Sequence, residues 1–143
     1  MNQPECIERL VNELSKLPGV GKKTAQRYAY AVVEWDKSAA EALASAIVEV
    51  KERVGKCEVC GNYSETPVCD ICLKRDKSVI CVVSYPKDVL AMERVSGFSG
   101  VYHVLGGVIS PIDGVFEDDL NIDGLIKRLD GVREVIIATN SSL

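Results

Sequence analysis

Apolar residues recur at helical spacing through the first third of the chain. This pattern predicts three helices, over about residues 4–16, 22–34 and 36–54. Residues 17–21 interrupt it, because Pro18 cannot extend the first helix and the glycines that follow permit a tight turn. The apolar positions of the first helix are Ile7, Leu10, Val11 and Leu14. We therefore expect two helices joined by a glycine hairpin, with the third helix packed over the pair.

The second half of the chain alternates between apolar runs and helical patterns. Continuous apolar runs predict buried strands over residues 78–83, 101–105 and 134–138. The intervening segments predict helices over residues 86–95 and from Asp118 or Asp119 to Leu129. Strands and helices that alternate at this spacing are typical of α/β folds with a parallel sheet. We expect an α+β protein built from several modules, with a three-stranded parallel sheet in the last of them.

Composition fits a globular protein, since 47% of the 143 residues are apolar and 27% are charged. The chain contains neither an apolar run of membrane-spanning length nor the pattern of a signal peptide. We expect a cytoplasmic protein with no membrane partner, whose thiols are reduced. Cys6 and Cys81 each stand alone in apolar patterns and are expected to be small buried residues.

The remaining cysteines form two Cys-x-x-Cys pairs separated by eight residues. They are Cys57 and Cys60, followed by Cys69 and Cys72. Four thiolates at one point are the usual closed site for structural zinc; a disulfide or an iron-sulfur cluster is the alternative. A segment this short cannot build its own core, so the metal would supply folding energy. With all four positions filled by cysteine, a catalytic zinc is not expected, and we interpret this cysteine knuckle as a joint between the two halves.

The net charge of −4 hides a basic segment. Between Leu14 and Val33 there are four bases and no acid, whereas residues 84–143 carry nine acids and five bases. The candidate anion-binding residues lie in the glycine hairpin and the helix after it: Gly19, Gly21, Lys22, Lys23 and Arg27. Glycines let a phosphate approach the backbone, and the helix start offers amides to it. This favours a clamp on the DNA backbone that reads no bases, the alternative being an ordinary αα-hairpin.

Functional groups in parallel sheets collect at the carboxyl ends of strands. Here those ends offer Ser84 and Asp88, glycines and Ser110 to Gly114, and Thr139 with Asn140. Two-metal phosphoryl transfer requires several converging carboxylates, and this set is short of them. The acids at 117–119 lie at an expected helix start, where they act as caps. His103, the only histidine, is expected to be a hydrogen-bonded, partly buried side chain within a strand, so no catalytic residue is predicted.

Several motifs together, in one order, resemble the RecR family of bacterial recombination proteins. They are Leu17-Pro18-Gly19-Val20-Gly21-Lys22-Lys23-Thr24-Ala25-Gln26-Arg27, the four-cysteine knuckle, Tyr102-His103-Val104-Leu105-Gly106-Gly107-Val108-Ile109-Ser110-Pro111-Ile112-Asp113-Gly114, and Ala138-Thr139-Asn140. The resemblance implies a helix-hairpin-helix region over residues 1–55, a C4 zinc finger over 56–77 and an incomplete Toprim domain over 78–143. By position, Lys23 and Arg27 match the family's DNA-facing bases, and the four cysteines match its zinc ligands.

The resemblance also implies partners and a role. Proteins of this family are not enzymes; they form dimers and tetrameric rings that encircle DNA. With RecO and RecF they help to load RecA onto gapped DNA in recombination and repair. Both single- and double-stranded DNA are implied as partners, and the implied location is the nucleoid.

Two departures from the family pattern affect this expectation. Ser84 stands where family members carry a glutamate, which weakens any metal-dependent role and the acidic contact for RecO. Family members also continue into an acidic segment, a further strand and an assembly tail, so we expect a shortened chain or one that cannot close the full ring. The alternative function is a Toprim-type metal-dependent nuclease or primase-like enzyme. Such an enzyme would need the glutamate and two following aspartates.

Overall fold

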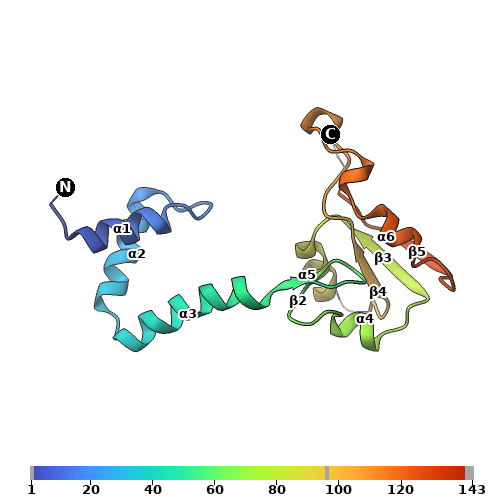
Figure 1. Ribbon diagram of the computed structural model, residues 1–143, viewed down its shortest axis with the longest axis horizontal. Helices are drawn as coiled ribbons and strands as arrows, with labels where there is room; N and C mark the ends of the chain where they lie inside the picture. Colours follow the sequence, from blue (N-terminus) through green and yellow to red (C-terminus); the bar gives the residue numbers. More distant parts are fainter. Residues whose placement is uncertain (1, 96, 141–143) are drawn as a thin grey trace. The chain divides into compact units, whose positions relative to one another are not determined.

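The computed structural model describes residues 2–95 and 97–140 and divides into two compact units. The units are Met1–Glu52, which is helical, and Arg53–Leu143, which combines the cysteine knuckle with the α/β sheet. Figure 1 shows their elements in chain order. The predicted fold class, with a helical N-terminal region, a four-cysteine site and a parallel sheet, is confirmed. The module boundaries at 55/56 and 77/78 stay predictions. In the described part of the chain, no helix has the length and apolar character needed to cross a bilayer.

The helical unit is held together by its first two helices, α1 (Glu5–Leu14) and α2 (Lys22–Glu34). Their shared core consists of Val11, Ala25 and Ala29, all buried, with partly buried side chains around them. Alanines on α2 let the two backbones approach closely. Gln3, which precedes α1, is hydrogen-bonded to α2. Its side-chain oxygen accepts hydrogen bonds from Gln26 (2.6 Å) and Tyr30 (3.1 Å). The predicted helix–hairpin–helix arrangement is confirmed.

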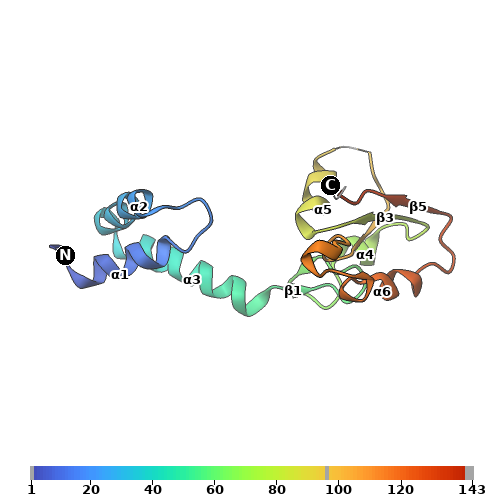
Figure 2. The ribbon, with the colours of Figure 1, turned by 90° about the horizontal axis from the view of Figure 1, so that it is seen from above.

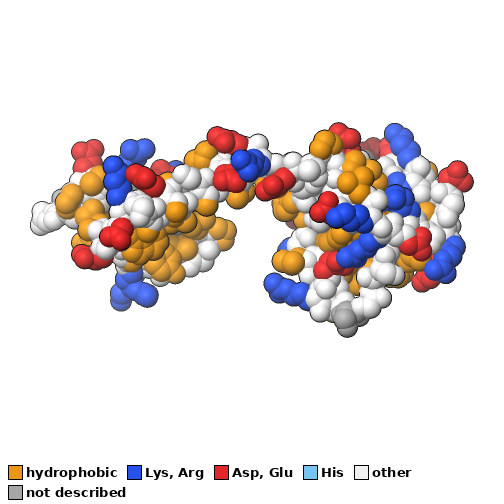
Figure 3. Space-filling model, turned by 90° about the horizontal axis from the view of Figure 1, so that it is seen from below, with side chains coloured by type: hydrophobic (Ala, Val, Ile, Leu, Met, Phe, Trp, Pro, Cys, Tyr) orange, Lys and Arg blue, Asp and Glu red, His pale blue; other side chains and the backbone are white. Residues whose placement is uncertain are grey.

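The third helix, α3 (Lys37–Arg53), has no buried residue. The expectation that it packs over the first pair is therefore wrong. Its apolar stripe does exist, but Leu43, Ile47 and Val50 are 43–59% exposed. Helical periodicity shows that a face is apolar without showing what covers that face. Figure 3 shows hydrophobic side chains gathered on one face of the helical unit.

Three parallel strands form the sheet of the α/β unit: β3 (Val79–Val83), β4 (Val101–Val104) and β5 (Glu134–Ile137). Their spatial order is β4-β3-β5, and Figure 2 shows β5 lying beside β3. The central strand pairs in register with both neighbours, so that Cys81 lies opposite Tyr102 on one side and Ile136 on the other. All four residues of β4 are buried. The three predicted strands are confirmed within one or two residues.

The helices of this unit follow the prediction less closely. Helix α5 (Pro86–Arg94) forms as expected, and the Asp88 carboxylate accepts the amide of Tyr85 (2.9 Å) at its start. The single helix expected up to Leu129 is wrong, because the segment contains a 3₁₀ turn (Glu117–Asp119) and a short helix α6 (Ile122–Ile126). Between them Leu120 is extended, and the amide of Asn121 donates to Leu105 O (2.9 Å). This tertiary bond interrupts the helix. The 3₁₀ turn that precedes it is capped by Asp119, as expected of an acid there.

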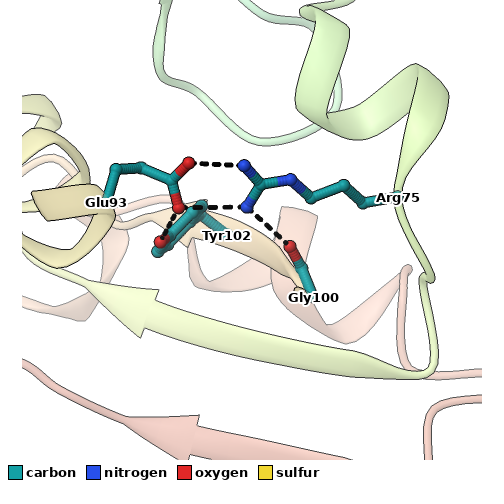
Figure 4. A network of polar contacts seen from close by, with 4 residues as sticks. All are labelled: Arg75, Glu93, Gly100 and Tyr102. Atoms are coloured by element: carbon teal, nitrogen blue, oxygen red, sulfur yellow. Dashed lines mark hydrogen bonds and ion pairs between the residues drawn. The ribbon is translucent and has the colours of Figure 1, made fainter. Parts of the chain in front are cut away.

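The cysteine knuckle packs on the sheet and belongs to the same unit. It contains a two-stranded antiparallel ribbon, β1 (Gly55–Lys56) with β2 (Tyr63–Ser64), and a short helix α4 (Asp70–Lys74). The amide of Val104 donates to Cys60 O at 2.7 Å, and Ile71 packs against core side chains of the sheet. After α4, Arg75 binds Glu93 of α5 in a network that includes Tyr102 and Gly100 O (Figure 4). The knuckle is thus fixed to the α/β half.

Candidate metal centre and nucleic-acid interface

The knuckle brings four buried cysteine sulfurs together. The ligand atoms of Cys57, Cys60, Cys69 and Cys72 all lie within 4.8 Å of one another. The Sγ atoms of Cys57 and Cys72 are 3.9 Å apart, and those of Cys60 and Cys69 are 3.6 Å apart. Four sulfurs at about 2.3 Å from a tetrahedral zinc ion would be about 3.8 Å apart, whereas a disulfide needs about 2 Å. The donor set therefore fits a structural zinc ion with no open coordination position.

Backbone amides of the knuckle point at the sulfurs. Cys57 Sγ accepts from the amides of Cys60 (3.4 Å) and Cys69 (3.3 Å), and Cys60 Sγ accepts from the amide of Asn62 (3.4 Å). Such bonds stabilise thiolates, the form in which cysteine binds metal. Burial acts to raise the pKa of Cys57, but these amides outweigh it and lower the pKa to about 6. The hydrogen bond with Cys72 and burial raise the pKa of Cys60, and burial raises the pKa of Cys69. Zinc binding must therefore displace thiol protons here.

The two solitary cysteines differ from each other. Cys81, on the central strand, is fully buried, as expected. Cys6 is exposed, so the expectation that it is buried is wrong. It lies on α1, whose only buried residue is Val11, and a helix that packs on one side exposes its other faces.

The glycine hairpin leaves its backbone open to approach. Gly19 adopts a positive φ of 78°, which L-residues rarely adopt, and a Cβ atom on Gly19 or Gly21 would meet nothing within 4 Å. Gly21 caps α2, and the first amide that bonds back into the helix is that of Ala25, to Gly21 O (2.9 Å). Within the described residues, the amides of Lys22, Lys23 and Thr24 have no hydrogen-bond acceptor. These donors lie at the positive end of the helix dipole.

Three exposed bases follow the hairpin. In the described part of the chain, none of Lys22, Lys23 and Arg27 forms an ion pair or a side-chain hydrogen bond. Lys23 and Arg27 are four residues apart and so lie on the same face of α2. The first turn of α2 contains no acid that would compete for these cations. The arrangement offers two cationic side chains beside a row of amide donors, which is what an anionic backbone requires.

The carboxyl end of β3 carries no carboxylate of its own. Ser84 is fully buried there, and its Oγ accepts a hydrogen bond from the amide of Asn140 (3.1 Å). The nearby Asp88 carboxylate is used to cap α5. A cavity of about 220 Å³ opens at this end of the sheet, lined mostly by apolar side chains together with Thr139 and Asn140.

His103 is hydrogen-bonded, as expected, but it is fully buried rather than partly buried. Its Nε2 contacts Asn121 O at 2.7 Å, and its Nδ1 faces Arg128 at 3.0 Å. Arg128 also donates to Tyr102 O (2.7 Å). Because Nδ1 accepts from Arg128, the ring is neutral with its proton on Nε2, where it donates to Asn121. Burial, with Arg128 adding to it, lowers the pKa of His103. The role of Arg128 was not predictable from its sequence position.

A second cavity, of about 380 Å³, lies between the knuckle ribbon and the start of α5. Tyr63 and Tyr85 line it, and neither was singled out from the sequence. The sequence offered one signal, since Tyr85 precedes Lys87 by two residues. Tyr63 lies opposite Lys56 only in the folded ribbon.

Three family models match the chain in the order of its modules. The RecR helix-hairpin-helix model matches residues 7–51, the RecR four-cysteine zinc finger model residues 54–73, and the Toprim model residues 78–143. The chain is also similar to curated proteins along most of its length. "Recombination protein RecR" of Enterococcus faecalis is 47% identical over 99% of this chain and 74% of that protein. The protein of the same name in Leifsonia xyli subsp. xyli is 50% identical over 96% of this chain and 71% of that protein.

Proposed function

Since the chain belongs to the RecR family, with its role in recombination and DNA repair, we propose that its glycine hairpin clamps the DNA sugar-phosphate backbone without reading sequence. The residues that would form the clamp are Gly19, Gly21, Lys22, Lys23 and Arg27. The glycines admit the phosphate, the free amides of α2 donate to it, and the bases neutralise it.

One observation carries this proposal: open amides and unpaired cations occur at the same helix start. The amides from Lys22 to Thr24 have no acceptor among the described residues, and the side chains of Lys23 and Arg27 have no acidic partner there. Every helix start leaves amides open, and what this one adds is the adjacent pair of cations. The chain's acidity does not oppose binding at the hairpin, because residues 14–33 carry four bases and no acid.

The finer role follows the family pattern. We infer that the chain acts with RecO, and with RecF, to help load RecA onto gapped DNA, as a homo-oligomer that contacts both single- and double-stranded DNA. Zinc supports the knuckle and takes no part in chemistry. The mass in solution, measured by light scattering with and without DNA, tests the assembly. A monomer under both conditions would exclude an encircling ring for this chain.

We infer further that the protein is not an enzyme. Supporting this, Ser84 occupies the end of β3, where a Toprim-type phosphoryl transferase needs a carboxylate, and Asp88 is committed to its helix cap. Incubating the zinc-loaded protein with DNA and magnesium should leave the DNA uncleaved and unextended. Cleavage or extension that co-purifies with the protein would establish the enzymatic alternative.

The clamp is tested by the double substitution Lys23→Ala with Arg27→Ala. We expect weaker binding to all sequences alike, and a salt dependence flattened by about 0.9 in log–log slope for each duplex phosphate that the variant no longer neutralises. The charge-matched control is Lys74→Ala with Lys127→Ala, which removes two exposed bases from the other unit. If both double variants lose affinity equally, net charge rather than the hairpin accounts for binding.

A further inference from the structure

The cavity beside the knuckle is large enough to hold a small ligand. Its volume of about 380 Å³ lies within the range of about 300–1,000 Å³ that is usual for small-ligand pockets. One wall is the β1–β2 ribbon, and the other is the start of α5. Figure 1 shows β2 and α5 on the same side of the α/β unit.

The ribbon wall presents an aromatic ring next to a cation. Tyr63 and Lys56 are register partners across the antiparallel ribbon, so their side chains lie on the same face. Both residues line the cavity, and 62% of the Tyr63 surface is exposed. The ribbon itself is fixed, because the amide of Cys57 donates to Asn62 O at 2.7 Å inside the zinc knuckle.

The opposite wall repeats the combination. Tyr85 and Pro86 line the cavity, and Lys87 Nζ lies 5.5 Å from the centre of the Tyr85 ring. The backbone of Tyr85 is held by its hydrogen bond to Asp88. The knuckle segment between the two ribbon strands is also held close to β4, since a Cβ on Gly61 would lie 3.1 Å from Val104 O. Two supported aromatic residues therefore flank one groove.

The charged side chains at the groove favour an anionic ligand. Lys56 is the only charged residue among the described residues that line the groove, and Lys87 lies over the ring of Tyr85, which lines it. No acidic residue is found among the described residues that line the groove, although the chain has a net charge of −4. Aromatic faces stack with nucleobases, and adjacent lysines pair with phosphates, which is the combination used by proteins that bind single strands. A peptide segment would gain less from this pairing of rings and cations.

We propose that this groove binds an unstacked nucleotide of a single DNA strand, with its base against Tyr63 and Tyr85 and its phosphates near Lys56 and Lys87. The proposal rests on the DNA-binding function proposed above, and it adds a second contact site with a different preference. In a duplex the bases are already stacked and paired, so the groove discriminates in favour of single strands.

Tyr63→Ala in the zinc-loaded chain tests the groove. Affinity for a short oligothymidylate should fall about fivefold or more, whereas duplex affinity should stay unchanged. Tyr63→Phe keeps the ring and should bind like the original protein. Phe116→Ala removes an aromatic side chain of comparable exposure, 54% against 62%, that does not line the groove, and it should have no effect. Lys56→Ala should weaken binding more than Lys74→Ala does.

Photo-crosslinking supplies an independent readout. A single-stranded oligonucleotide carrying iodouracil should crosslink to the peptides that contain Tyr63 or Tyr85, as identified by mass spectrometry. Crosslinks confined to α2, or a Tyr63→Ala variant with unchanged affinity for single strands, would overturn the groove while leaving the hairpin clamp standing. If Tyr63→Ala abolished the binding of a protein partner but left single-strand binding intact, the groove would be a peptide site, and the proposal would be overturned. Lys23→Ala with Arg27→Ala tests the clamp separately, because its effect extends to duplex DNA.

Discussion

Arg75 and Glu93 form a two-point ion pair that joins the end of the cysteine knuckle to helix α5. One guanidinium nitrogen donates to Glu93 Oε2 at 3.0 Å, the other contacts Oε1, and the Tyr102 hydroxyl donates to the same carboxylate. Parallel bonds of this kind fix orientation as well as distance. The pair therefore sets how the knuckle sits on the sheet.

Glu93→Gln should lower the free energy of unfolding of the α/β unit by about 1–2 kcal/mol, because it leaves Arg75 and Tyr102 without their anion. The effect stays moderate since the two side chains are 29% and 27% exposed and water screens them. Urea denaturation measures this loss. The control is Asp123→Asn, which changes an exposed acid of α6 and should alter the free energy of unfolding by less than about 0.5 kcal/mol.

The same pair predicts an acid dependence. The hydrogen bond from Arg75 holds the pKa of Glu93 below its usual value of 4.5. A carboxylate with a lowered native pKa stabilises the fold above its unfolded pKa, and this stabilisation is lost as pH falls through the native pKa. The difference in the free energy of unfolding between the original protein and Glu93→Gln should therefore narrow below pH 4.5. A difference that did not change with pH would mean that the substitution acts through packing alone.

Loss of a zinc ligand should unfold the knuckle. Cys60→Ser is expected to remove most bound zinc and to lower the melting temperature of the α/β unit sharply, because structural zinc contributes about 10–16 kcal/mol of apparent binding energy in zinc-finger peptides. Cys6→Ser is the control, since Cys6 is exposed and outside the knuckle. It should retain one zinc per chain by elemental analysis. Equal zinc content in the two variants would contradict the four-sulfur site.

His103 should make stability depend on pH near neutrality. Its native pKa is lowered, so the unfolded chain binds the proton more readily than the folded chain. The contribution of His103 to the free energy of unfolding is therefore fully present above its unfolded pKa of 6.5. It declines as the pH falls below that value, with a slope of at most about 1.4 kcal/mol per pH unit. Because His103 is the only histidine, His103→Gln should flatten this slope in denaturation curves. An unaltered slope would assign the dependence to other groups.

The hairpin glycines should respond differently to alanine. Gly19→Ala is expected to destabilise the helical unit by about 1–2 kcal/mol, because its φ of 78° is unfavourable for a residue with a Cβ. Gly21 has a φ of −81° and open space around it, so Gly21→Ala should cost only the helix-cap preference, about 0.5–1 kcal/mol. Thermal melts followed by circular dichroism compare the two. Equal effects would mean that the turn at Gly19 does not require its positive φ.

Sequence patterns were sufficient where local chemistry decides the structure. Helix α2 begins after Gly21 and ends at Glu34, as predicted, because a glycine hairpin and a break in the periodicity bound it. The Cys-x-x-Cys spacing likewise identified the four sulfurs that the fold brings together. Both features depend on residues close together in the chain.

Tertiary contacts explain what the sequence could not predict. The helix expected up to Leu129 is interrupted because Asn121 bonds to Leu105 and His103, two residues of the sheet region. The stripe on α3 correctly indicated an apolar face but not its exposure. Tyr63 and Tyr85 meet at one cavity although they are far apart in sequence. Nothing in the local pattern encodes such pairings.

The hydrogen bond from Val104 to Cys60 O has a further consequence for the apo protein. Strand β4 lies at an edge of the sheet, and all its residues are buried. The knuckle covers this edge and satisfies one of its amides. A knuckle that unfolds without zinc would uncover a short, apolar edge strand, which is a template for pairing with other chains. Metal depletion is therefore expected to cause aggregation before it causes complete unfolding.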